Sequence, residues 1–126
     1  WSDTIQNCIN RNANYKFKFL VCRNKTRRKI YASKDIEIFN TVDDLLKIRS
    51  PKAIYIAGDP RTNYSIIKKV SKLNIQCIVE KPLSLNLNEV NKLKKFTHNN
   101  NNKIYLNLPH LNDKKFLEQS NNGQIE

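Results

Sequence analysis

The chain alternates between two hydrophobic periods. Apolar runs short enough for strands lie at 17–22, 36–38, 53–57, 75–79 and 103–107. Between most of them, apolar residues recur every three or four positions, the period of a helix with one buried face. These predicted stripes are Ile5, Cys8 and Ile9; Leu45, Leu46 and Ile48; Ile66, Ile67, Val70 and Leu73; and Val90, Leu93 and Phe96. Two further helices are expected over 25–33 and 113–120.

Polar residues mark where helices begin and where turns lie. Residues 41–44 read Thr-Val-Asp-Asp and have the form of a capping box, with Thr41 as N-cap and Asp44 at the third helical position. Residues 86–89, Asn-Leu-Asn-Glu, have a similar form. Four consecutive asparagines at 99–102 predict a surface turn.

Strict alternation of helix and strand indicates parallel strands joined by right-handed crossovers. The strand at 53–57 is almost wholly apolar, which is typical of a strand covered by helices on both faces. The fold class is therefore α/β, an open, doubly wound parallel sheet with helices on both faces. No internal repeat or linker divides the chain.

The 126 residues have the length of one domain with a single core. The chain begins at Trp1 and contains no Met, and residues 121–126 resemble a turn that leads into a new element. We therefore expect a fragment that is truncated at both ends. No apolar run approaches the roughly 18 residues that span a bilayer.

The three cysteines are odd in number and lie among apolar residues, a pattern of reduced core thiols in a cytoplasmic protein. His98 and His110 share no ligand spacing with them, so no metal site is predicted. These cysteines are Cys8, Cys22 and Cys77.

The net charge is +12, which a nucleic-acid-binding protein could show. The lysines are spread over predicted solvent-facing helix positions, however, and an AT-rich genome would produce the same abundance of Asn, Lys and Ile. Aromatic interleaving and a recognition-helix pattern are absent, so nucleic-acid binding remains the weakest of three functional hypotheses. Only residues 23–29 form a compact basic cluster.

Ligands of open parallel sheets bind at the carboxyl ends of the strands. Polar or turn-forming residues follow four of the predicted strands, at 22–24, 57–60, 80–82 and 107–110. In the third of these, a Lys can donate to a substrate oxygen or carry a proton, a neighbouring Glu can hold the ammonium, and a Pro that follows can be cis. The same three residues, Glu80, Lys81 and Pro82, also fit a purely structural explanation. Glu80 and Lys81 would form an ion pair in a loop, and Pro82 would end that segment before the helix that begins near residue 86.

Two motifs at matching spacing carry a family resemblance. Residues 53–64 form an apolar strand that ends in a small-residue-and-Pro turn, and residues 78–84 form a strand that ends in E-K-P-L. Together with Asn107 and the G-x-I-like residues 123–125, they resemble the Gfo/Idh/MocA family (glucose-fructose oxidoreductase, inositol dehydrogenase and relatives). The resemblance implies a Rossmann-like nucleotide-binding domain of an NAD(P)-dependent oxidoreductase.

The resemblance also implies roles for individual residues. Lys81 matches the motif lysine beside the nicotinamide and the substrate and is the candidate catalytic residue, while Glu80 and Pro82 would shape the cofactor pocket. Lys81 is therefore counted among the cofactor-binding residues as well.

The remaining cofactor-binding candidates also follow strands. Gly58, Asp59 and Pro60 would lie along the dinucleotide, where close approach of the backbone favours Gly58. Asn63 stands where the family often has His, a departure that leaves its role open. Asn107 is a candidate for the nicotinamide side.

The resemblance sets the expected domain boundary. Residues 1–110 would form the dinucleotide-binding domain without its Gly-rich loop, which would precede Trp1, and residues 111–126 would begin the substrate-binding domain. The catalytic Asp and His of that second domain are not assigned to Asp113 or His110. The full-length protein is expected to be a homo-oligomer, because family members associate through the second domain.

The end of the second strand of such a fold selects the cofactor. NAD enzymes usually carry an acid there, whereas this chain has Arg23 and Asn24 followed by Lys25. Arg23 could bind a 2′-phosphate through charge-assisted hydrogen bonds, supported by Lys25 or Arg27. We therefore predict a preference for NADP(H), with NAD(H) possible; a solvated helix start in a Lys-rich protein is the competing interpretation.

Two functional hypotheses follow from the family resemblance. In the first, the protein transfers a hydride to or from a hydroxyl or carbonyl carbon of a sugar, cyclitol or similar polar substrate, without nucleic acid or membrane as a partner. In the second, it is a non-catalytic nucleotide-binding or regulatory relative with the same fold. A phosphate loop upstream and an Asp/His pair downstream would favour the enzyme.

Overall fold

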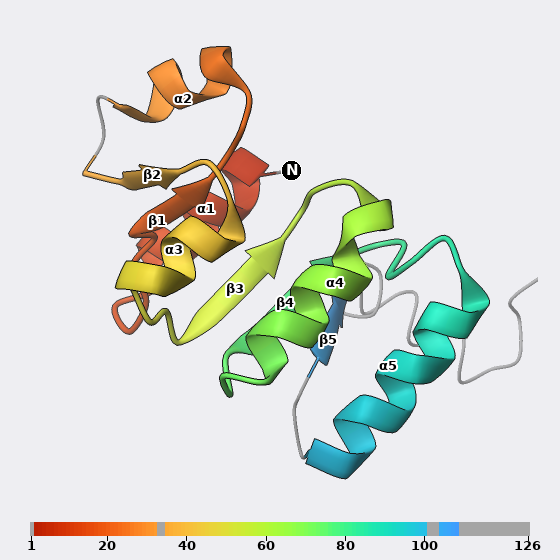
Figure 1. Ribbon diagram of the computed structural model, residues 1–126. Coiled ribbons are helices and arrows are strands. Elements are labelled where there is room, and N and C mark those ends of the chain that lie inside the picture. The colour runs from red at the N-terminus through yellow and green to blue at the C-terminus, as the bar shows by residue number, and fades with distance from the viewer. Residues whose placement is uncertain (1, 33–34, 101–103, 109–126) are drawn as a thin grey trace, which may run out of the picture. The chain divides into compact units, whose positions relative to one another are not determined.

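Helices and strands alternate along the described chain, as the hydrophobic pattern predicts (Figure 1). The computed structural model describes residues 2–32, 35–100 and 104–108. In chain order the elements are α1 (Ser2–Arg11), β1 (Phe19–Val21), α2 (Lys25–Ala32), β2 (Glu37–Phe39), α3 (Val42–Ile48), β3 (Ala53–Ile56), α4 (Pro60–Ser71), β4 (Gln76–Glu80), α5 (Leu87–Asn100) and β5 (Ile104–Asn107). The helix predicted over 113–120 and the domain boundary at 110/111 lie outside the described residues.

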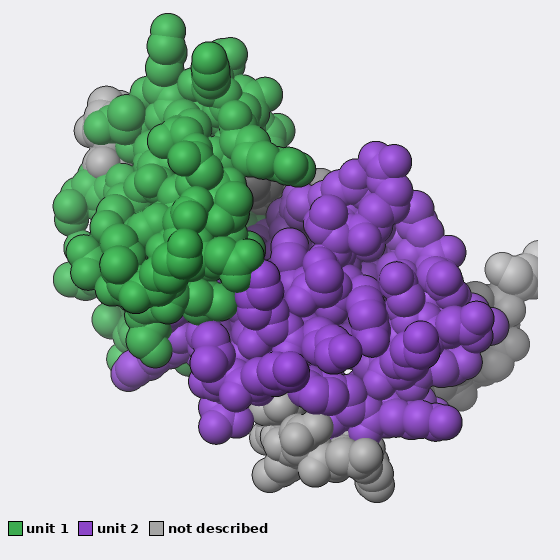
Figure 2. All heavy atoms as spheres, viewed as in Figure 1, with its two compact units in different colours: residues 1–50 green, residues 51–126 purple. Residues whose placement is uncertain are grey.

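The chain divides into two compact units, each with its own parallel sheet (Figure 2). Unit 1, Trp1–Ser50, contains β1 and β2, and unit 2, Pro51–Glu126, contains the sheet β3-β4-β5. All three pairings are parallel, which confirms the α/β class. In a doubly wound sheet of order 3-2-1-4-5-6, the second strand pairs with the third, and the fourth, fifth and sixth strands pair in series. Here β1 and β2 pair as the second and third strands of that fold do, and β3, β4 and β5 pair as its fourth, fifth and sixth strands do.

Unit 1 is held by a small aromatic and aliphatic core. Phe19 of β1 meets Phe39 of β2 edge to face, with ring centroids 6.3 Å apart. The predicted capping box is confirmed, because the Thr41 hydroxyl accepts from the Asp44 backbone N–H and the Asp44 carboxylate accepts from the Thr41 N–H. Two backbone donors at the start of α3 are thereby satisfied, and Leu45 is buried one turn further along.

Unit 2 has the more completely buried core. Helix α4 packs against β4 and α5. Its N-cap is Asp59, whose carboxylate accepts from the Arg61 backbone N–H, and Pro60 occupies the first turn, where its missing N–H costs nothing. Side chains from α4, β4 and α5 fill the interior, each at most 2% exposed: Ile67, Val70, Cys77, Val79 and Leu93.

The two faces of the β3-β4-β5 sheet differ. Along β4, Cys77 and Val79 are buried, whereas Gln76 and Ile78 are exposed. Because side chains alternate along a strand, Glu80 at the end of β4 lies on the same face as Ile78. The parallel register pairs Glu80 with Asn107 and Ile78 with Tyr55, so these residues share the face opposite the buried residues.

Several details of the sequence prediction are wrong. Leu73, expected in the buried stripe of α4, is 56% exposed because α4 ends at Ser71. The turn predicted over 99–102 is wrong for Asn99 and Asn100, since α5 continues through Asn100, and the rest of that prediction lies outside the described residues. Of the cysteines, only Cys77 is buried, and Cys8 is exposed.

The second predicted capping box takes a different form. The Asn86 side chain accepts from the Asn88 backbone N–H at 2.9 Å. The Glu89 carboxylate accepts from the Ser84 hydroxyl, and this hydroxyl oxygen accepts from the Asn86 N–H at 3.1 Å. Ser84 is therefore inserted between the two residues that a capping box joins directly.

Among the described residues, no helix is long and apolar enough to cross a membrane.

Candidate functional site

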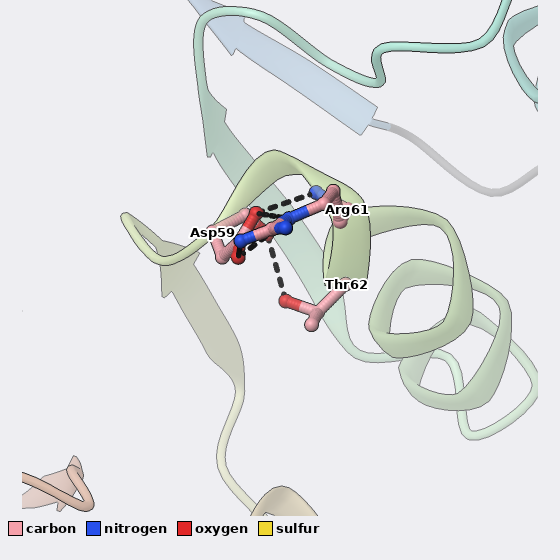
Figure 3. Close-up of polar contacts among 3 residues, drawn as sticks. All are labelled: Asp59, Arg61 and Thr62. Carbon is pink, nitrogen blue, oxygen red and sulfur yellow. Dashed lines mark hydrogen bonds and ion pairs between the residues drawn. The ribbon is translucent and has the colours of Figure 1, made fainter.

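The turn between β3 and α4 contains three predicted cofactor-binding residues. Gly58 is exposed, and a Cβ at this position would meet nothing within 4 Å, so the space beside its backbone is open. Figure 3 shows the Arg61 guanidinium folded back on the Asp59 carboxylate, with an N–O distance of 2.6 Å. The Thr62 hydroxyl donates to the Asp59 carbonyl at 2.8 Å. This turn is ordered by its own side chains, while Gly58 keeps an accessible backbone.

The turn after β4 carries the candidate catalytic residue. The Lys81–Pro82 peptide is cis, which confirms the isomer considered from the sequence. The Pro82 carbonyl accepts from the Asn63 side-chain amide at 3.2 Å. Asn63 lies on α4 and is 2% exposed, and its Oδ1 has no hydrogen-bond partner among the described residues. Helix α4 therefore holds the backbone of the turn directly after Lys81.

Glu80 is held by one residue from each neighbouring strand. Its carboxylate oxygen Oε1 accepts from the Tyr55 hydroxyl and, at 2.6 Å, from the Asn107 amide. The same amide lies 3.3 Å from the Tyr55 hydroxyl oxygen. We refer to Tyr55, Glu80 and Asn107 as the Glu80 clamp. It joins the carboxyl ends of β4 and β5 to β3 on one face of the sheet.

The clamp changes the proton affinity of its members. Partial burial acts to raise the pKa of Glu80, but hydrogen bonds from Tyr55, Asn107 and the Lys81 backbone, with the Lys81 charge, bring it below the ordinary value. Partial burial and the bond to the Glu80 carboxylate raise the pKa of Tyr55. The clamp is therefore a carboxylate with a neutral phenol donor at neutral pH.

The structure corrects the expected contact between Glu80 and Lys81. No ion pair joins their side chains in the described chain, and the carboxylate is instead occupied by Tyr55 and Asn107. Lys81 itself is exposed. Its backbone lies between two fixed neighbours, Glu80 and Pro82, while its side chain extends into solvent.

The cofactor-selecting residues of unit 1 precede α2. The Asn24 side chain accepts from the Arg27 backbone N–H at 3.0 Å, and its carbonyl accepts from the Arg28 N–H at 3.0 Å, so Asn24 caps the helix. Arg23 and Lys25 are exposed, and the first turn of α2 contains no acid. Within the described ranges, no hydrogen bond or ion pair involves Arg23.

Sequence reasoning placed most of these residues but missed Tyr55. The structure brings Asn63 to Pro82 and Glu80 to Asn107, whereas Arg23 and Asn24 belong to unit 1. A signal for Tyr55 existed, because it is the one polar-tipped side chain in an otherwise aliphatic strand. The described residues contain no group of three or more His, Cys, Asp or Glu that could hold a metal ion.

Comparison with known proteins assigns the chain. The model of the Gfo/Idh/MocA family, described as an oxidoreductase family with an NAD-binding Rossmann fold, matches residues 2–108. The chain belongs to this family. The match covers all the described elements and confirms the Rossmann-like fold. No curated protein matches the chain significantly.

Solved structures of several dehydrogenases are similar in fold to this chain. Scyllo-inositol dehydrogenase from Lactobacillus casei, solved with NAD(H) and scyllo-inositol, has a TM-score of 0.80 at 15% identity, over 94% of this chain and 37% of that one. Myo-inositol 2-dehydrogenase from Lactobacillus plantarum has a TM-score of 0.77 at 17% identity, over 93% of this chain and 36% of that one. The WlbA dehydrogenase from Bordetella pertussis, in complex with NADH and UDP-GlcNAcA, has a TM-score of 0.75 at 13% identity, over 84% of this chain and 31% of that one. The chain thus spans about a third of the length of these proteins.

Each unit has one feature that suits part of a dinucleotide. In unit 2, the open backbone at Gly58 suits close approach of a ligand. In unit 1, the acid-free basic start of α2 suits a phosphate. The sequence has only two glycines, so it contains no G-x-G-x-x-G loop for a pyrophosphate. Recognition of the pyrophosphate therefore does not come from a loop of that kind within these residues.

Proposed function

We propose that this chain is the nucleotide-binding part of a nicotinamide-dependent oxidoreductase that acts on a hydroxyl or carbonyl carbon of a sugar, cyclitol or similar polar substrate. The observation that carries the proposal is the turn at Lys81, whose backbone is fixed through Glu80 and Pro82 while the Lys81 side chain is free. Family membership supports the class of chemistry. The substrates of the inositol dehydrogenases and of the WlbA dehydrogenase support a polar small molecule.

The proposed chemistry assigns one role to Lys81. The nicotinamide, when bound, accepts or supplies the hydride. In carbonyl reduction the Lys81 ammonium would donate a hydrogen bond to the carbonyl oxygen and deliver its proton there. In alcohol oxidation the neutral Lys81 amine would accept the hydrogen bond of the substrate hydroxyl and take up its proton. Such general acid–base assistance typically contributes ~10²–10⁴ in rate. The fixed backbone on both sides limits the positions that the ammonium can reach, which lowers the entropy cost of the reactive geometry.

The experiment is Lys81→Ala in the full-length protein, assayed for nicotinamide oxidation or reduction with a panel of cyclitols and sugars. We expect turnover to fall by ~10²–10⁴ with little change in cofactor affinity. Lys92→Ala, an exposed lysine on α5, is the matched control and keeps full activity. Unchanged turnover in Lys81→Ala would exclude the proposed role.

We further propose that the cofactor is NADP(H) in preference to NAD(H), with Arg23 as the main determinant. The exposed guanidinium beside the acid-free start of α2 supports this preference. The family description and the neighbours solved with NAD or NADH support a nicotinamide dinucleotide more generally. A cytoplasmic location and a homo-oligomeric full-length protein remain predictions from the sequence and from the family resemblance.

A further inference from the structure

The sequence places opposite charges side by side at Glu80 and Lys81, and such neighbours attract each other. The structure does not pair them. The Glu80 carboxylate is engaged on the face of the sheet that also carries Ile78 and Tyr55. The Lys81 side chain has no hydrogen bond or ion pair among the described residues. The fold therefore directs the Glu80 carboxylate to partners other than Lys81.

The competitors come from both neighbouring strands. Glu80 ends β4, the central strand of its sheet, and accepts from Tyr55 of β3 on one side and Asn107 of β5 on the other. The Lys81 backbone N–H also interacts with this carboxylate. Among the described residues, the hydrogen bonds and charges that act on the Glu80 carboxylate come from Tyr55, Asn107 and Lys81. Two strands thus hold the carboxylate at a position set by the sheet register.

We propose that Tyr55 is a positioning residue for Lys81: with Asn107, it holds the Glu80 carboxylate in the clamp and so keeps the Lys81 ammonium unpaired. This inference rests on the proposed function of Lys81. A pair between Glu80 and Lys81 would be largely exposed and therefore weak. Two directed hydrogen bonds to a carboxylate are stronger, so the clamp forms in preference to the ion pair.

The clamp also gives Glu80 a function without contact with the substrate. A carboxylate held in a fixed orientation supplies negative potential at the turn without being turned toward Nζ, and no ion pair joins the two side chains among the described residues. Both side-chain donors bond Oε1, so removal of the Tyr55 hydroxyl leaves Asn107 as the remaining side-chain donor among the described residues and lets the carboxylate turn toward Lys81. Lys81 would then be less reactive as a free amine.

The test measures the nucleophilicity of Lys81 by trace labelling with acetic anhydride, quantified by mass spectrometry relative to the exposed Lys92. In Tyr55→Phe we expect Lys81 to be labelled about two- to fivefold more slowly, the factor that corresponds to an exposed ion pair. Tyr105→Phe is the matched control, because Tyr105 lies on the same face of the same sheet and is 46% exposed. It should leave the labelling rate unchanged.

The double variant Tyr55→Phe/Glu80→Gln separates positioning from a general loosening of the sheet. If the effect runs through the carboxylate, the neutral amide can neither pair with Lys81 nor supply negative potential, so the labelling rate rises to at least that of the parent. An equal rate in parent and Tyr55→Phe, or slow labelling that persists in the double variant, overturns the proposal. Should Tyr55→Phe fail to fold by circular dichroism, Asn107→Ala decides by the same criterion.

These outcomes are independent of the proposed reaction. Labelling needs neither cofactor nor substrate, so it reports on the clamp even if the protein catalyses no hydride transfer. Loss of turnover in Lys81→Ala tests the chemistry, whereas the labelling rate in Tyr55→Phe tests the origin of the free ammonium.

Discussion

The two units present their candidate site residues in opposite ways. In unit 1, Arg23 stands exposed before a helix start, and Asn24 bonds only to its own turn. In unit 2, Glu80 and the Lys81–Pro82 turn are held by residues from β3, β5 and α4. The difference suggests a division of roles. A group that neutralises a phosphate tolerates freedom, because charge acts over distance, whereas a group that moves a proton needs a fixed position.

The largest expected effect concerns the core beneath the held turn. Ile67 is fully buried between α4 and its neighbours, so Ile67→Ala should lower the free energy of unfolding by about 2–5 kcal/mol through lost burial and a residual cavity. Leu73→Ala, at a position that is 56% exposed, should change it by less than about 0.5 kcal/mol. Urea unfolding followed by circular dichroism measures both. Equal losses would remove the burial contrast on which the comparison depends.

The next effect concerns the free guanidinium of unit 1. Arg23→Asp should shift the ratio of NADP(H) to NAD(H) affinity toward NAD(H) by about ten- to a hundredfold, the worth of one or two charge-assisted hydrogen bonds. The control Lys29→Asp makes the same charge change in the last turn of α2. Cofactor titration of the full-length protein gives the ratio, and an unchanged ratio would refute the assignment of Arg23.

A smaller effect concerns the buried amide that holds the turn. Asn63→Asp keeps the shape but replaces the donor to the Pro82 carbonyl with a carboxylate oxygen, so it should cost about 1–3 kcal/mol or more of unfolding free energy. Asn91→Asp, an exposed asparagine on α5, should be nearly neutral. A neutral Asn63→Asp would show that α4 does not fix Pro82 through this amide.

The smallest effect is the pH dependence of the Glu80 clamp. The folded pKa of Glu80 lies below its ordinary value, so the carboxylate stabilises the fold above about pH 4.3, the ordinary Glu pKa, and this contribution disappears as pH falls through the folded pKa. Tyr55→Phe should therefore lose roughly 0.5–1.5 kcal/mol of stability near pH 7 and less below about pH 4. The control Tyr105→Phe should show no such trend. A pH-independent difference for Tyr55→Phe would mean that its hydroxyl does not act through Glu80.

The sequence predicted those parts of the fold that depend on neighbours along the chain. The order of elements and the Thr41 capping box follow from local chemistry. The cis isomer before Pro82 was only one of two that the sequence allowed. The extension of α5 into the asparagine run did not follow, because an established helix propagates through weak helix formers at little cost. The exposed position of Leu73 was missed because the apolar periodicity of the sequence continues two residues beyond the end of α4 at Ser71.

The contacts of the Glu80 clamp could not be predicted from local sequence patterns, because its residues lie far apart in the chain. Tyr55 and Glu80 are 25 positions apart, and Glu80 and Asn107 are 27 apart. Their contact depends on the register of three strands, which no spacing in the sequence specifies. The motif residues Glu80, Lys81 and Pro82 were located correctly, but the partner of Glu80 was assigned to the adjacent charge instead of the adjacent strands.

The pair of Asp59 and Arg61 in Figure 3 has a consequence for the response to ionic strength. Asp59 already supplies the anion that the positive end of α4 attracts, and Arg61 cancels its charge. A ligand beside Gly58 therefore meets a turn without net charge, and dissolved salt should affect that contact little. The first turn of α2 contains basic residues and no acid, so salt should weaken phosphate binding there. The dependence of cofactor affinity on salt concentration would report mainly on unit 1.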